Sequence, residues 1–147
     1  MRFCPLPPPP TLAQPTLFQI LLFEHDYLRA SGTRHWLSQQ PGYVVRLTDR
    51  PEELLIQCEA GVVDLVLLDA VRSIASCPAI LSHQLKSNPK TAHIPIVLLS
   101  SDGLVEGSWL EEYRVDAISR SVLSLPGTLE QVRQMCASNV SSCFVEL

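Results

Sequence analysis

Residues 18–26 read FQILLFEHD, an apolar run that is followed at once by Glu24, His25 and Asp26. A continuous apolar run of this length, rather than an alternating one, is typical of a strand buried on both faces of a parallel sheet. Acidic residues placed directly after such a strand indicate that a positive group is held at its end. This run is the first of the series that decides the fold.

Four further short runs follow along the chain, and amphipathic segments of helical period separate them. The runs are residues 43–47 (YVVRL), 64–68 (DLVLL), 94–99 (IPIVLL) and, more weakly, 116–119 (DAIS). Pro51-Glu52-Glu53 is a typical helix start, and Leu54, Leu55 and Cys58 form the inner stripe of that helix. The fourth helical segment carries Trp109 and Tyr113, which we expect on a partner surface. Five βα units in a row predict an α/β fold with a doubly wound, five-stranded parallel sheet and helices on both faces.

Length and composition limit the class of protein. The chain has 147 residues, a net charge of −4 and scattered Lys and Arg residues, so we expect one domain that does not bind nucleic acid. The opening residues lack the apolar core of a signal peptide, and no stretch is long enough to span a membrane, so we expect neither element. Its five cysteines form no CxxC pair, which indicates reduced thiols and a cytoplasmic protein.

The two ends differ from the middle in composition. Residues 1–16 are rich in proline and predict a disordered, solvated tail. Residues 17–138 hold all the predicted strands and helices and form the folded domain. Residues 139–147 (NVSSCFVEL) are expected to be a loose C-terminal tail.

Polar side chains gather where the predicted strands end. In a doubly wound sheet, function lies beyond the carboxyl ends of the strands. The residues at those positions are Glu24, His25 and Asp26 after the first run, Asp69 after the third, Ser100 and Ser101 after the fourth, and Arg120 and Ser121 after the fifth. The sequence therefore predicts a site of acidic and hydroxyl groups at one edge of the sheet.

With these residues placed, residues 18–136 resemble the receiver domain of two-component response regulators. ILLFEHD stands where the family has ILLVEDD, and VVDLVLLDAV carries the family's Asp residues before and after the third strand. LKSNPKTAHIPIVLLSS (residues 85–101) is the most specific stretch. The resemblance implies a flavodoxin-like sheet with the strand order 2-1-3-4-5.

The resemblance also implies a chemistry. Asp69 would accept a phosphoryl group from the phosphohistidine of a sensor histidine kinase or phosphotransfer protein, and Ser100 would bind a phosphoryl oxygen. Mg²⁺ would be held by Glu24 and Asp69. Such a domain is not an enzyme in the usual sense; it takes part in a phosphorelay and signals through a downstream protein partner.

Two parts of the family's site differ here. His25 stands at the second acidic position, and imidazole is a poor ligand for a hard cation, so Mg²⁺ binding is expected to be weak or absent. Asp26 is one residue late for that position; it either caps the first helix or, if the loop shifts, supplies the missing ligand. Ser121 stands in place of the family's Lys, and Arg120, one residue early, reaches the site only if the strand slips.

Three functions remain open from sequence. The first is a single-domain receiver that is phosphorylated on Asp69. The second is a pseudo-receiver, which would act as an interaction module without phosphorylation. The third, a flavodoxin-like enzyme or cofactor binder, is disfavoured because no Gly-rich phosphate loop follows the first strand.

Overall fold

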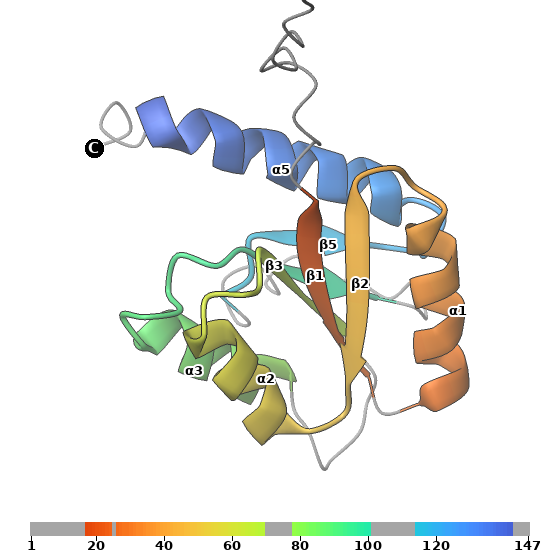
Figure 1. Ribbon diagram of the computed structural model, residues 1–147, viewed down its shortest axis with the longest axis horizontal. Helices are drawn as coiled ribbons and strands as arrows, with labels where there is room; N and C mark the ends of the chain where they lie inside the picture. Colours follow the sequence, from red (N-terminus) through yellow and green to blue (C-terminus); the bar gives the residue numbers. More distant parts are fainter. Residues whose placement is uncertain (1–16, 25, 70–77, 101–113, 143–147) are drawn as a thin grey trace, which may run out of the picture.

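A computed structural model describes residues 17–24, 26–69, 78–100 and 114–142 (Figure 1). All five apolar runs form strands; β1 has the expected bounds, and the ends of the others differ by at most two residues from those expected. The strands are β1 (Phe18–Phe23), β2 (Tyr43–Thr48), β3 (Leu65–Asp69), β4 (Ile96–Leu99) and β5 (Ala117–Ser119). β4 begins later than expected because Pro95 lacks the N–H group that a ladder hydrogen bond requires.

The five strands make one parallel sheet in the order β2-β1-β3-β4-β5, which confirms the predicted order. β3 lies in the middle, where Leu67 pairs with Leu22 of β1 and with Val97 of β4. Every residue of β3 and β4 is buried. This explains why these runs show no alternation between apolar and polar residues.

Helices cover both faces of the sheet, as predicted (Figure 1). The helices in the described residues are α1 (Tyr27–Ser38), α2 (Pro51–Glu59), α3 (Pro78–Ser87) and α5 (Leu125–Ser142). α1 and α5 pack on one face, with Leu37 and Leu129 in its core. α2 and α3 pack on the other, with Leu54, Cys58 and Leu85 in its core.

Helix α5 continues to Ser142, past residue 138, where the folded domain was expected to end. Residues 139–142 therefore belong to a helix rather than to a loose tail. The remaining tails, residues 1–16 and 143–147, and the expected fourth helix with Trp109 and Tyr113 lie outside the described residues. Among the helices that are described, none is both long and apolar enough to cross a membrane.

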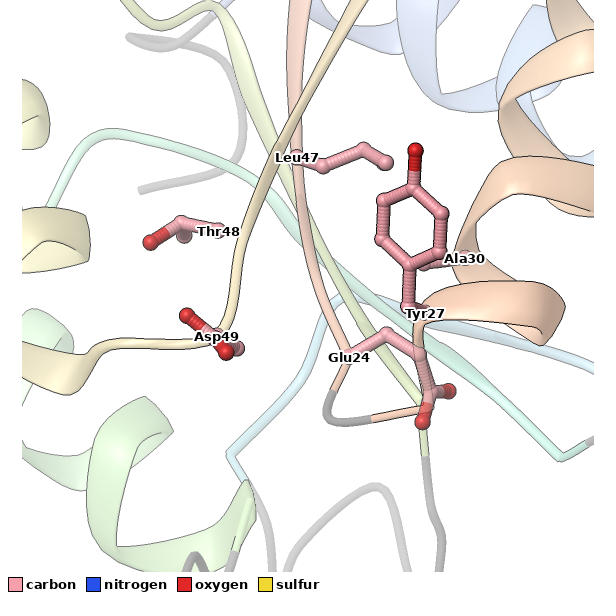
Figure 2. Close-up of a pocket in the computed structure, with 6 residues that line it drawn as sticks. All are labelled: Glu24, Tyr27, Ala30, Leu47, Thr48 and Asp49. Atoms are coloured by element: carbon pink, nitrogen blue, oxygen red, sulfur yellow. The ribbon is translucent and has the colours of Figure 1, made fainter.

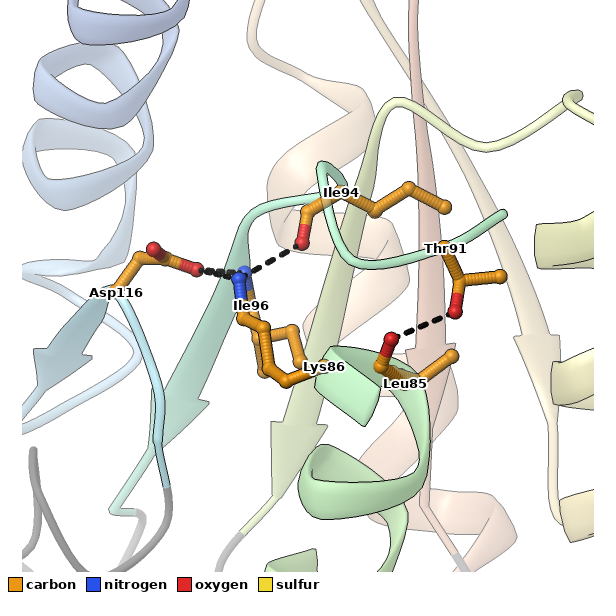
Figure 3. A network of polar contacts seen from close by, with 6 residues as sticks. All are labelled: Leu85, Lys86, Thr91, Ile94, Ile96 and Asp116. Atoms are coloured by element: carbon orange, nitrogen blue, oxygen red, sulfur yellow. Dashed lines mark hydrogen bonds and ion pairs between the residues drawn. The ribbon is translucent and has the colours of Figure 1, made fainter. Parts of the chain in front are cut away.

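A polar network ties α3 to the start of β4 and to the turn before β5 (Figure 3). The Asp116 carboxylate accepts hydrogen bonds from the Ile96 backbone N–H and from Lys86 Nζ, both at 2.8 Å. Lys86 Nζ also donates to the Ile94 carbonyl at 3.2 Å. At the end of α3, the buried Thr91 hydroxyl donates to the Leu85 carbonyl at 2.7 Å. These bonds fix the loop that leads into β4, at the amino end of that strand.

The buried thiol of Cys58 should make stability depend on pH. Burial raises the pKa of Cys58 from 9.0 to about 11, against a smaller lowering by Arg46. Because the unfolded thiol loses its proton first, the free energy of unfolding should fall as the pH rises from about 9 to about 11. Urea unfolding at several pH values measures this, and Cys58→Ala should show a shallower fall. An equal fall in both proteins would contradict the expectation.

Candidate functional site

Three adjacent strands bring the expected acidic and hydroxyl residues to the carboxyl edge of the sheet. Glu24 follows β1, Asp69 ends β3 and Ser100 follows β4. Phe23 pairs with Leu68 and Asp69 pairs with Leu99, so the three side chains come from neighbouring backbone positions. Glu24 and Asp69 are each 5% exposed and Ser100 is 0% exposed. The structure thus places two buried carboxyl groups and a buried hydroxyl at one edge.

Glu24 has one carboxylate oxygen without a hydrogen-bond partner among the described residues. Its Oε1 accepts a hydrogen bond from the Asp26 backbone N–H at 3.0 Å. Its Oε2 is buried and makes no hydrogen bond to the described residues. Burying a carboxylate oxygen without a donor or cation is unfavourable. This atom is therefore a place where a positive group would be stabilised.

Asp26 is the N-cap of α1. Its Oδ1 accepts hydrogen bonds from the backbone N–H groups of Leu28 at 3.0 Å and Arg29 at 3.2 Å. The side chain is therefore turned toward the first turn of the helix, as expected for a capping Asp. His25, which precedes it, lies outside the described residues.

A complete Mg²⁺ site is not assembled in the described part of the chain. There, no group of three or more His, Cys, Asp or Glu side chains is placed to hold a metal ion. The expected set of Glu24, Asp69 and Asp26 is thus not brought together, because Asp26 caps α1. Glu24 and Asp69 are suitable hard oxygen ligands, and they would hold Mg²⁺ together with water or phosphoryl oxygens that complete its octahedral shell.

The end of β5 does not direct a positive side chain into the site. Arg120 is exposed, and its side chain makes no hydrogen bond or ion pair among the described residues. Ser119 occupies the buried position instead, and its hydroxyl bonds to the Ser121 carbonyl at 2.8 Å and to the Ser124 hydroxyl at 3.0 Å. Arg120 stands one residue before the position of the family's Lys, and its side chain is exposed. This is the orientation expected for a strand without a slip.

A pocket lies beside Glu24 that the sequence pattern did not indicate. A pocket of about 210 Å³ is lined by Glu24, Tyr27, Ala30, Leu47, Thr48 and Asp49 (Figure 2). It lies between the end of β2 and the first turn of α1. Asp49 follows β2 just as Asp69 ends β3, so applying the strand-end rule to the second strand as well would have indicated this residue.

Solved structures share this arrangement of strands and helices. One is the N-terminal domain of a response regulator receiver protein from Methanoculleus marisnigri, with 24% identity, a TM-score of 0.60 and coverage of 71% of this chain and 84% of that one. Another is the receiver domain of a sensor histidine kinase from Pseudomonas aeruginosa, solved with magnesium in its active-site cleft. Its identity to this chain is 17% and its TM-score 0.66, and the match covers 79% of this chain and 97% of that one. A third is the chemotaxis response regulator CheY4 of Vibrio cholerae. Its identity is 17% and its TM-score 0.65, and the match covers 80% of this chain and 99% of that one.

The chain has the receiver fold. The strand order β2-β1-β3-β4-β5 is the flavodoxin-like order, and the match covers 97% and 99% of the last two neighbours. No family model matches the chain. No curated protein matches it either. The positions of Glu24, Asp69 and Ser100 on this fold are the basis for a functional proposal.

Removing the cap of α1 should weaken the fold slightly. Asp26→Ala leaves the N–H groups of Leu28 and Arg29 without their acceptor, so the free energy of unfolding should fall by about 1 kcal/mol. Asp26→Asn keeps a capping oxygen and should be nearly neutral. Urea unfolding compares the two variants with the parent. Equal losses for Ala and Asn would mean that the charge of Asp26, not its capping oxygen, stabilises the protein.

Proposed function

We propose that this protein is a receiver-type signalling domain that accepts a phosphoryl group on Asp69. The observation that carries the proposal is the placement of Glu24, Asp69 and Ser100, all buried, at the carboxyl ends of three adjacent strands. Function in a doubly wound sheet lies at this edge. A carboxylate can act as a nucleophile toward phosphorus when the surrounding charge is balanced.

The proposed transfer needs few groups. A carboxylate oxygen of Asp69 attacks the phosphorus of a phosphohistidine, the new O–P bond forms as the P–N bond breaks, and the imidazole leaves with its electron pair and takes up a proton. The product is an acyl phosphate on Asp69. The Ser100 hydroxyl, which follows the adjacent strand, donates a hydrogen bond to a phosphoryl oxygen. Positioning and charge stabilisation therefore account for most of the catalysis.

Charge balance is where this site is weak. In the receiver fold a magnesium ion offsets the negative charge of carboxylates and phosphoryl oxygens. Here Glu24 and Asp69 would supply two ligand side chains, His25 stands at the position of a third in the sequence, and Arg120 is exposed. We therefore expect weak Mg²⁺ binding and slow, incomplete phosphorylation, because the transferring group develops charge that few positive groups stabilise.

The partners follow from this chemistry. The phosphoryl donor would be a sensor histidine kinase or a phosphotransfer protein in the cytoplasm. The net charge of −4 and the scattered basic residues do not favour DNA as the output, so a downstream protein would read the state of the domain.

A second candidate is a pseudo-receiver, which binds its partner in the same way whether or not Asp69 is modified. Two observations favour it: the capping role of Asp26 leaves the site without a possible Mg²⁺ ligand, and the exposure of Arg120 leaves it without a positive side chain. In that case Asp69→Ala would retain most of the affinity for the partner. Loss of signalling by a folded Asp69→Ala protein would exclude this candidate.

The first candidate is tested by incubating the full-length chain with acetyl phosphate and MgCl₂ and following its intact mass. We expect a slow gain of one phosphoryl group that is absent in Asp69→Asn, because the amide is not a nucleophile of the required kind. Ser100→Ala should gain the group more slowly than the parent. Asp64→Asn is the matched control: Asp64 lies at the other end of the same strand, and this variant should be labelled like the parent. Labelling that persists in Asp69→Asn would contradict the proposal.

A further inference from the structure

β5 is a short strand that its own ladder holds weakly. It has three residues, and among the described strands it pairs only with β4. A strand with so few ladder hydrogen bonds is among the first segments to open locally. Its start is fixed by Asp116, whose carboxylate accepts hydrogen bonds from the Ile96 backbone N–H and from Lys86 (Figure 3). The residues that follow Ser119 decide how firmly its other end is held.

Three serine hydroxyls close the turn that follows β5. We call Ser119, Ser121 and Ser124 the serine turn. The Ser121 hydroxyl donates to Ser124 Oγ at 3.2 Å, the Ser124 hydroxyl lies 3.0 Å from Ser119 Oγ, and the Ser119 hydroxyl donates to the Ser121 carbonyl at 2.8 Å. The Ser124 backbone N–H donates to Ser121 Oγ at 3.2 Å. Each hydroxyl has one proton to donate, so a single closed chain of bonds uses all three.

The Ser119 hydroxyl is the protected member of the serine turn. Ser119 is 1% exposed, whereas Ser124 is exposed. A hydrogen bond shielded from water is the stronger one, and leaving a buried group without its partner is costly. Leu125, the first residue of α5, is 0% exposed in the core between that helix and the sheet. The turn is therefore anchored at both ends, by Ser119 in the sheet and by Leu125 in the core.

The serine turn is joined through the backbone to the proposed phosphoryl site. The Ser100 backbone N–H donates to the Ser119 carbonyl at 2.8 Å. Ser121 stands at the position of the family's Lys, so uncharged hydroxyls close the turn here. Because the three hydroxyl protons are used inside the turn, a phosphoryl group on Asp69 finds no spare donor there to draw toward itself.

We propose that Ser119 is a positioning residue and that the serine turn holds the end of β5, and with it the Ser100 backbone, in one arrangement before and after phosphorylation. The surface at the start of α5 is then the same in both states, and a partner that contacts it binds both equally. Only the statement about the phosphorylated state rests on the proposed function, since the hydrogen bonds of the turn are present without a phosphoryl group.

The first test is amide hydrogen exchange in the ¹⁵N-labelled, unmodified full-length chain. In Ser119→Ala, the Ser100 amide should exchange about five- to tenfold faster than in the parent, the factor expected for the loss of one or two hydrogen bonds. Ser121→Ala should have a smaller effect, because the bonds of its hydroxyl are exposed to water. Thr128→Ala is the matched control: its hydroxyl bonds to the Ser124 carbonyl from within α5, and the Ser100 amide should exchange as in the parent. The Leu67 amide, in the central strand, reports global unfolding and should not change in any variant.

The second test compares the amide signals of residues 119–125 before and after incubation with acetyl phosphate and MgCl₂, with the labelled fraction measured by intact mass. We expect these signals to be the same in labelled and unlabelled molecules. Movement of these signals on labelling would overturn the proposal, and so would a Ser100 amide that exchanges in Ser119→Ala at the parent rate. If no label forms, the proposed function fails, and hydrogen exchange alone decides whether Ser119 positions Ser100.

Discussion

Leu67→Ala is expected to lower the free energy of unfolding by about 3–5 kcal/mol, the largest loss of stability that we predict. Leu67 is 0% exposed in the central strand β3, beside Leu22 and Val97. Truncation removes apolar contacts and leaves a cavity that strands paired on both sides cannot collapse to fill. A domain of this size is stable by about 5–15 kcal/mol, so the variant should be near its folding limit.

The measurement is equilibrium urea unfolding with a matched surface control. Ile56→Ala removes an aliphatic side chain of similar size from α2, but Ile56 is 61% exposed. It should change stability by no more than about 0.5 kcal/mol. A loss below about 1 kcal/mol for Leu67→Ala, or equal losses for the two variants, would show that the core is not centred on β3.

His25→Asp is expected to tighten Mg²⁺ binding by about tenfold or more, equivalent to about 1.4 kcal/mol. The change adds a hard oxygen ligand beside Glu24 and Asp69, and a neutral imidazole offers only a poor one. It also removes a group whose protonation would repel the ion at low pH. Because a bound cation offsets the charge of the transferring group, phosphorylation of this variant by acetyl phosphate should also be faster.

Calorimetric titration with MgCl₂ measures the affinity directly. His25→Leu is the matched control, since it removes the imidazole without adding an oxygen and should bind Mg²⁺ as weakly as the parent. If His25→Asp binds no more tightly than His25→Leu, position 25 does not face the site. In that case His25 would not be the reason for the expected weak Mg²⁺ binding.

Most of the fold could be predicted from the pattern of apolar residues. LVLLD and IVLL carry no polar face, so they had to lie between two layers, and they are the fully buried β3 and β4. The acidic or hydroxyl residues Glu24, Asp69 and Ser100 then had to meet at one edge, because parallel strands end on the same side. These residues could be located because their positions depend on strand direction alone.

Other features depend on side-chain orientation or on contacts between distant segments, which a single sequence does not reveal. Asp26 could cap α1 or serve as a ligand, and only the geometry of the helix start decides for the cap. Leu28, an apolar residue at the start of the same helix, is 81% exposed, which its place in an apolar helical pattern did not indicate. The pocket beside Tyr27 and Leu47 depends on how the side chains at the start of α1 and the end of β2 are oriented, which the sequence pattern does not give.

The location of the phosphoryl group tests the central claim most directly. The full-length chain is incubated with acetyl phosphate and Mg²⁺, and the acyl phosphate is then trapped chemically in one portion of the sample. That portion is digested and the modified peptide is sequenced by mass spectrometry, while a second, untrapped portion is treated with hydroxylamine. We predict that the label is on Asp69, at low occupancy, and that it is released by hydroxylamine, as an acyl phosphate should be. A label on a histidine or on any other acidic residue, or no label at all in a folded protein, would contradict the assignment of Asp69 as the phosphoryl acceptor.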